Sequence, residues 1–87
     1  MATEAIKVFA TWCGPCKVYG KTWSKVAEEL GDTVKFREVD IDKDTTGFAV
    51  EYNIESVPST VILKDGQDPI VEEGRLSKDE LKELLND

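Results

Sequence analysis

Trp12-Cys13-Gly14-Pro15-Cys16-Lys17 lies between two segments of different periodicity. Before it, the apolar run Ile6–Ala10 contains β-branched residues and predicts a short buried strand. After it, apolar side chains recur at helical spacing, namely Tyr19, Trp23, Val26, Ala27 and Leu30. Gly14-Pro15 separates the two segments, and proline is favoured in the first turn of a helix. We therefore expect the two cysteines to lie at a strand-to-helix junction.

The rest of the chain continues the alternation of strands and helices. We expect a helix over about 16–30, a strand over 34–41, a short helix over 46–52, strands over 60–63 and 69–73, and a last helix that begins at Ser77. A strand followed by a helix and another strand predicts a parallel pair with a right-handed crossover. The expected fold class is α/β, in the order β-α-β-α-β-β-α, with a four-stranded mixed sheet flanked by three helices. We expect residues 1–87 to form a single domain.

Local signals mark several of the expected ends. Gly31-Asp32 should end the first long helix, and Asp65-Gly66 is typical of a hairpin turn. The candidates to cap the short helix are Asp42, Asp44 and Thr45, and Asn53 can adopt the left-handed conformation at its end. The last helix should begin with a capping box between Ser77 and Glu80, with Leu76 and Leu81 as a hydrophobic staple.

Composition narrows the functional classes. The chain carries a formal net charge of −7, which argues against a nucleic-acid-binding surface. No segment approaches the roughly 20 apolar residues of a membrane span. Met1–Ala5 lacks the apolar core of a signal peptide, so we expect a cytoplasmic protein with no membrane partner.

Cys13 and Cys16 are the two cysteines of the chain, and it has no histidine. A structural disulfide gains most by closing a long loop, and this pair would close almost none. A structural zinc site needs four Cys or His ligands, so we expect no bound metal. A redox dithiol remains as the main interpretation.

A strand-to-helix junction suits that chemistry. Cys13 would lie where unpaired backbone N–H groups and the helix dipole favour an anion, so its thiolate, the reactive form, is favoured at neutral pH. Cys16, one turn further, would attack a mixed disulfide formed by Cys13. Gly14 and Pro15 keep the turn compact.

The hexapeptide 12–17 resembles the active site of thioredoxins without a mismatch. Val57-Pro58 resembles the hydrophobic residue and cis-proline of that family, and Gly74 resembles its glycine beside the substrate groove. The resemblance extends from about Ile6 to Leu85 and implies a thioredoxin-like fold. It implies that Cys13 attacks and Cys16 resolves.

The resemblance also implies roles for the neighbouring residues. Trp12 would shield the dithiol and present an apolar contact, although a core aromatic is the alternative, and Lys17 would support the site. The Val57–Pro58 bond would be cis and would turn the Val57 backbone toward a bound peptide, which could add as a strand. Gly74 would let that peptide approach closely.

Three features depart from the family. The chain lacks the extra strand and helix that usually precede the active-site strand, and its layout looks more like that of a glutaredoxin. The first long helix lacks the usual kinking proline near Lys21, so we expect it to be straighter, with a slight bend at most at Gly20. Apart from these departures, Lys17, Lys21 and Lys25 share a helix face, which is either solvated or a basic docking stripe.

The third departure is a charge exchange. Lys7 stands six residues before Cys13, where the family has a buried aspartate, and Glu38 stands where the family has a lysine. A partly buried pair could relay the proton of Cys16, with Glu38 or a neutral Lys7 as the acceptor. A charged Lys7 would instead favour the thiolate and make the protein a weaker reductant. The third possibility is that both side chains reach solvent and matter little.

Together these features predict a thiol-disulfide oxidoreductase that reduces protein disulfides, acts as a monomer and needs no cofactor besides the Cys13–Cys16 pair. The resemblance implies recycling by a flavin-dependent thioredoxin reductase. One alternative is a glutaredoxin-like enzyme recycled by glutathione, which the short layout favours and the Gly-Pro spacer disfavours. The other alternative is a docking subunit whose thiols are dispensable.

Overall fold

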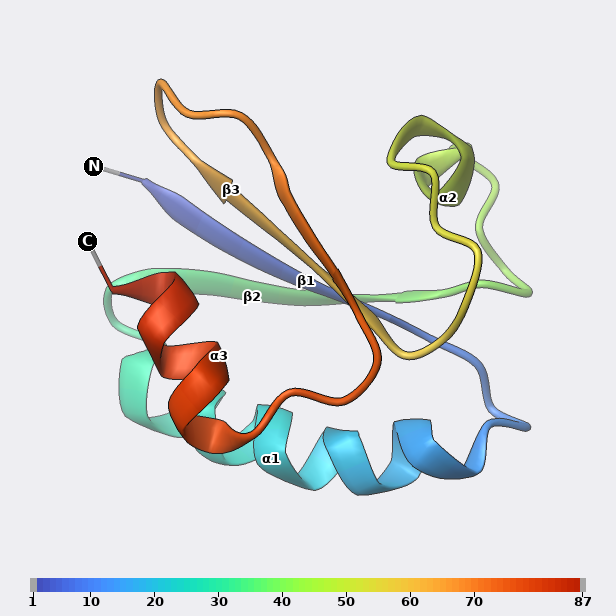
Figure 1. Cartoon of the computed structure of the whole chain (residues 1–87), viewed down its shortest axis with the longest axis horizontal. Helices are drawn as coiled ribbons and strands as arrows, with labels where there is room; N and C mark the ends of the chain where they lie inside the picture. The colour runs from blue at the N-terminus through green and yellow to red at the C-terminus, as the bar shows by residue number, and fades with distance from the viewer. Residues whose placement is uncertain (1, 87) are drawn as a thin grey trace.

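The computed structural model of the chain describes residues 2–86. Its elements follow the expected order: β1 (Thr3–Phe9), α1 (Gly14–Leu30), β2 (Val34–Asp40), α2 (Phe48–Glu51), β3 (Ser59–Lys64), β4 (Ile70–Glu73) and α3 (Lys78–Leu85). The four strands form one mixed sheet flanked by three helices (Figure 1). The predicted fold class is confirmed.

The sheet has the strand order β2-β1-β3-β4. β1 runs parallel to β2 and antiparallel to β3, and β3 runs antiparallel to β4. The middle of β1 is therefore paired on both sides, and Lys7 lies opposite Glu38 on β2 and opposite Thr60 on β3. Side chains that lie opposite one another share a face of the sheet.

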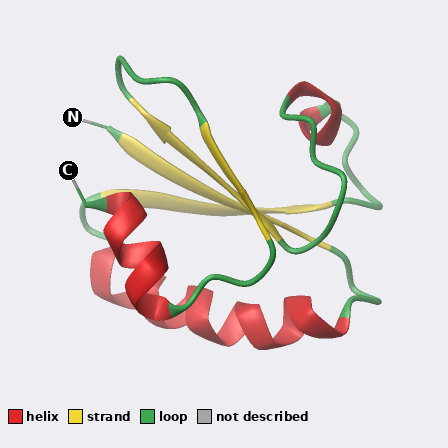
Figure 2. Cartoon of the chain, in the orientation of Figure 1, coloured by secondary structure: helices red, strands yellow, loops and turns green. Residues whose placement is uncertain are grey.

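The two faces of the sheet carry different helices. Figure 2 shows α1 and α3 on one side of the strands and α2 on the other. Residues of β1 alternate between the sides, so that Ala5 belongs to a core cluster with Tyr19 and Leu81, while Ile6 belongs to a second cluster with Phe48. The first cluster fixes α1 on the sheet, and α1 in turn carries the dithiol.

Several boundaries differ from the sequence expectation. β1 begins at Thr3, before the apolar run, because Thr3 is paired with both Val34 and Lys64. α2 is shorter than expected, since its N-cap is Gly47, at φ +76°, with no capping side chain. Asp44 precedes this N-cap residue in the chain, and its carboxylate still accepts a hydrogen bond from the backbone N–H of Ala49 in α2, at 3.1 Å.

The helix ends show what local signals capture. Gly31 ends α1 as expected, but with right-handed backbone at φ −61°. Glycine is needed here because there is no room for a side chain: a Cβ would lie 2.7 Å from the Ala27 carbonyl oxygen. Asn53 is left-handed at φ +54° as predicted. The capping box of α3 is confirmed, with Ser77 Oγ accepting from Glu80 N–H and the Glu80 carboxylate accepting from Ser77 N–H.

Between residues 2 and 86, none of the helices has both the length and the apolar character needed to cross a bilayer.

Candidate functional site

The two cysteines meet at the beginning of α1. Cys13 is the N-cap residue of the helix, with extended backbone at φ −93°. Cys16 lies one turn further, its Cα 5.3 Å from that of Cys13, and the two sulfurs form a disulfide. The backbone N–H of Cys16 points at Cys13 Sγ, 3.2 Å away. A helix N-terminus that donates to this sulfur will stabilise a thiolate there once the disulfide is reduced.

The local sequence explains this placement. Pro15 occupies the first turn of α1, where its missing N–H costs no helical hydrogen bond. Gly14 is the first residue of the helix and has open space around it. The backbone N–H of Cys13 donates to the Ala10 carbonyl at 3.2 Å, which closes the turn between β1 and α1.

The dithiol is largely enclosed. Cys13 and Cys16 are 5% and 4% exposed and form a small cluster with Ala10. Phe9, Ile41 and Val57 pack against this cluster. Both cysteines are therefore almost equally enclosed by these neighbours.

A second wall of the site comes from the segment before β3. The Val57–Pro58 peptide bond is cis, and the Val57 carbonyl oxygen lies 3.7 Å from Cys13 Sγ. Gly74, at φ +88°, donates its N–H to the Pro58 carbonyl at 2.8 Å. The structure thus brings Val57, Pro58 and Gly74 to the dithiol side of the sheet. Their roles in substrate binding stay a prediction.

Trp12 is an exposed residue of this surface, not a core aromatic. Its side chain is 70% exposed, and its indole N–H donates to Asp42 Oδ2 at 2.8 Å. This bond holds the ring beside a shallow pocket of about 170 Å³, lined by Trp12, Ile41, Ile54, Glu55, Ser56 and Val57. This hollow therefore adjoins Val57, whose carbonyl oxygen lies 3.7 Å from Cys13 Sγ.

Lys7 and Glu38 form an ion pair, with 2.8 Å between Nζ and Oε1. The Lys7 side chain is 7% exposed, and the Glu38 side chain is 52% exposed. The lysine is therefore buried beneath α1, and the carboxylate is the end of the pair that meets solvent. The possibility that both groups stay in solvent is wrong for Lys7.

Tyr19 and Thr60 form a buried polar contact on the same side of the sheet. Their hydroxyl groups lie 2.6 Å apart, and both residues are fully buried. Burial raises the pKa of Tyr19 to about 12, although the hydrogen bond to Thr60 acts in the opposite direction. No local pattern predicts this contact, because its partners are 41 residues apart in the chain.

The lysines of α1 lie outside the site's contacts. Lys17, Lys21 and Lys25 are exposed, which fits a solvated face. α1 runs from Gly14 to Leu30 as one uninterrupted α-helix through Gly20.

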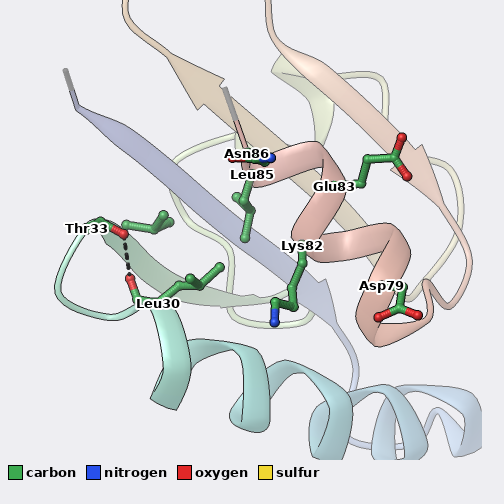
Figure 3. A pocket seen from close by; sticks show the side chains of 8 residues that line it. Leu30, Thr33, Asp79, Lys82, Glu83, Leu85 and Asn86 are labelled. Carbon is green, nitrogen blue, oxygen red and sulfur yellow. Dashed lines mark hydrogen bonds between the residues drawn. The ribbon is translucent and has the colours of Figure 1, made fainter.

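A larger hollow than the one beside Trp12 lies elsewhere on the surface. Figure 3 shows a pocket of about 420 Å³ between the end of α1, the start of β2 and α3, with Leu30, Lys82 and Leu85 among its lining residues. α1 has 17 residues, so this pocket lies about 25 Å along the helix from the dithiol. In the described residues 2–86, no three His, Cys, Asp or Glu side chains are grouped to hold a metal ion.

Three residues that contact Trp12 or line its pocket are not predicted from the sequence as site residues: Asp42, Ile41 and Ile54. By sequence, Asp42 is a candidate helix cap, whereas its contact with Trp12 joins residues 30 apart. Its position directly after the strand beside β1 was the available signal, because parallel neighbouring strands end at the same edge of a sheet.

Comparison with known proteins places this geometry in a family. The sequence matches the family model described as Thioredoxin over residues 3–87. It is 38% identical to a thioredoxin of Mycoplasmoides gallisepticum over 80 residues, which cover 92% of this chain and 78% of the relative. It is 35% identical to a thioredoxin of Bacillus subtilis, with 90% and 74% covered.

Solved structures agree. Chloroplastic thioredoxin z superposes with a TM-score of 0.85 at 30% identity, covering 97% of this chain and 75% of the other. The thioredoxin of Malassezia sympodialis superposes with a TM-score of 0.81 at 33% identity, covering 95% and 71%.

Proposed function

This chain belongs to the thioredoxin family, and from that premise we propose that Cys13 attacks disulfides of other proteins and that a thioredoxin reductase restores the dithiol. The chain is a thioredoxin-type protein-disulfide oxidoreductase. The glutaredoxin-like and docking-subunit alternatives are not favoured by these relatives. The observation that carries the proposal is the position of Cys13 Sγ, which caps α1 and accepts from the Cys16 N–H.

The reaction balances as two exchanges. The Cys13 thiolate attacks one sulfur of a substrate disulfide, a Cys13–substrate disulfide forms, and the other substrate sulfur leaves as a thiolate. The Cys16 sulfur, after losing its proton, attacks Cys13 Sγ, so the Cys13–Cys16 bond forms and the second substrate sulfur leaves. Two electrons pass to the substrate, and its two sulfurs take up two protons.

The surface around Cys13 supports a role in holding the substrate. We assign the apolar contact to Trp12, beside its pocket, and the main-chain contact to Val57, whose carbonyl lies 3.7 Å from Cys13 Sγ. Pro58 and Gly74 line the same edge, joined by their 2.8 Å hydrogen bond. An extended segment that carries the substrate cystine would add along this edge. Gly14, Pro15 and Lys17 support the first turn of α1.

The setting of the protein is part of the proposal. A dithiol that must stay reduced suits a reducing compartment such as the cytoplasm. We assign the reductase as electron donor because the relatives are thioredoxins. We also propose that the chain forms a single domain, because the core clusters of Ala5 and of Ile6 both pack on the same sheet.

Reduction of insulin disulfides tests the proposal. NADPH with thioredoxin reductase should sustain turnover by the wild-type chain, and glutathione with glutathione reductase should sustain far less. Cys13→Ser should abolish turnover, and Cys16→Ser should accumulate the mixed disulfide. Preference for glutathione would overturn the assigned donor. Full turnover by Cys13→Ser would overturn the assigned nucleophile.

A further inference from the structure

Lys7 is a buried charge that the exchange reaction described above does not use. It lies in the middle of β1, 6% exposed, on the face of the sheet that α1 covers. Its Nζ lies so close to α1 that a Cβ on Gly20 would be 3.5 Å away. The same Nζ lies 5.2 Å from the centre of the Phe9 ring. The ammonium is therefore held between the strand and the helix that carries the dithiol.

The position of Gly20 relates Lys7 to Cys16. The two α1 residues are four apart, so they share a helix face and lie about 6 Å apart along the axis. Phe9, which contacts the Lys7 ammonium, also packs against the cluster that contains both cysteines. The Lys7 ammonium thus lies beside Gly20, one helical turn after Cys16 on α1, and both Lys7 and Cys16 are almost completely buried.

The two ends of the Lys7–Glu38 pair differ in their contact with water. Glu38 is half exposed, so solvent screens its negative charge, whereas Lys7 is enclosed. The positive charge of the pair is therefore less screened by water than the negative charge. A lysine engaged as an ammonium has three donors and no acceptor, so it cannot take the Cys16 proton.

Other polar groups near Lys7 are occupied or in solvent. On β3, Thr60 is bound to Tyr19 of α1. On β2, Asp40 accepts from the backbone N–H of Asp42 at 3.0 Å. Lys17 and Lys21 of α1 are exposed. Among residues 2–86, Lys7 is the one charged residue that is buried.

We propose that Lys7 is a positioning residue that increases the acidity of the Cys16 thiol, and that Glu38 opposes it by partly neutralising its charge. The inference rests on the proposed function and specifies the regulation of the same dithiol. A nearby positive charge favours a thiolate over a thiol. It therefore stabilises the reduced protein and makes it a weaker reductant than the same fold without Lys7.

The test uses a background in which Cys16 is the remaining thiol. In Cys13→Ser protein, the ultraviolet absorbance of the thiolate reports the titration of Cys16 directly. Adding Lys7→Met should leave about fivefold less thiolate at a fixed pH below the midpoint, and adding Glu38→Gln should give severalfold more. Lys21→Met removes an equal charge from the exposed side of α1 and should change the titration little.

A second readout uses the intact dithiol. In equilibrium with glutathione, two glutathione thiols pass two electrons and two protons to the Cys13–Cys16 disulfide and become glutathione disulfide. Lys7→Met should move this equilibrium about fivefold toward the protein disulfide, and Glu38→Gln should move it toward the dithiol. Circular dichroism shows whether each variant is folded.

Opposite shifts by the two variants support the inference, because a purely structural pair would change both readouts in one direction or in neither. Shifts in the same direction, or an unchanged Cys16 titration in Lys7→Met, overturn it. If Lys7→Met fails to fold, the Glu38→Gln shift decides alone, and no shift there overturns the inference. These readouts do not use insulin or the reductase, so they can fail while the proposed function stands.

Discussion

The Tyr19 and Thr60 hydroxyl groups share a hydrogen bond of 2.6 Å inside the protein, and this bond ties α1 to β3. Tyr19 lies one turn after Cys16 on the helix, and Thr60 lies opposite Lys7 in the sheet. The bond therefore joins the helix that carries the dithiol to the strand that follows Pro58. It fixes the two walls of the site relative to each other.

Removal of this bond should destabilise the protein. Tyr19→Phe leaves the buried Thr60 hydroxyl without its partner, which should lower the free energy of unfolding by about 1–3 kcal/mol. Tyr19→Phe/Thr60→Val removes both polar groups and should recover part of that loss. Urea denaturation measures both. A double variant less stable than the sum of the two single losses would contradict the contact as described.

Alkaline pH should act through the same tyrosine. The pKa of Tyr19 is raised from 10.0 to about 12 by burial, so the folded state holds the phenol proton more tightly than the unfolded state does. This contribution to stability is complete below pH 10 and is lost as the pH rises toward 12. Stability curves of wild type and Tyr19→Phe should converge across that range. A constant gap between them would contradict the assigned cause.

Trp12 should matter for protein substrates more than for the sulfur chemistry. Trp12→Ala removes the exposed ring beside the pocket and should lower kcat/KM for insulin about tenfold, equivalent to about 1.4 kcal/mol. Thiol alkylation of Cys13 should change less. Asp42→Ala frees the indole N–H and should have an intermediate effect on kcat/KM. Val50→Ala is the control, because Val50 is 82% exposed on α2, and an equal loss there would remove the assigned role of Trp12.

Gly74 offers a test with a matched partner. Gly74 and Gly66 both have left-handed backbone, at φ +88° and +75°, and each has open space where a Cβ would be. Alanine at either position should cost about 1–2 kcal/mol of stability through the backbone alone. Gly66 belongs to the turn between β3 and β4, at the end of the sheet away from the dithiol (Figure 1). Gly74→Ala should therefore raise KM for insulin and Gly66→Ala should not, and equal KM values would contradict the predicted role of Gly74.

The capping box of α3 should contribute measurably to stability. Ser77→Ala removes the Oγ that accepts from Glu80 N–H at 3.1 Å, and it should lower the free energy of unfolding by about 1 kcal/mol. Ser24→Ala, at an exposed position within α1, should be neutral or slightly stabilising. Equal losses at both serines would show that the cap contributes nothing specific.

Local signals explain which features the sequence predicted well. The capping box, the helical periodicity of α1 and the left-handed Asn53 each depend on residues within one or two turns of chain. The β1–α1 junction needed a strand pattern and a Gly-Pro break side by side. Leu76 packs against the core cluster that contains Leu81, and the hydrophobic staple between the two residues stays a prediction.

The features that the sequence does not predict depend on contacts between residues far apart in the chain, or on a choice between several candidate capping residues. Trp12 meets Asp42 across 30 residues and Tyr19 meets Thr60 across 41, and no local pattern specifies either partner. Around α2, several residues could cap the helix, and the backbone placed Gly47 at the N-cap while Asp44 bonds to Ala49. The extent of β1 was set by strands on both sides rather than by its own apolar run.

Cys13 combines two tasks in one atom, since the sulfur that opens α1 is also the proposed nucleophile. Serine is among the residues that best occupy a helix N-cap. Exchanging sulfur for oxygen at this position should therefore preserve the architecture while silencing the reactivity. Cys13→Ser should therefore be a folded, redox-inactive variant that binds partners without exchanging electrons with them.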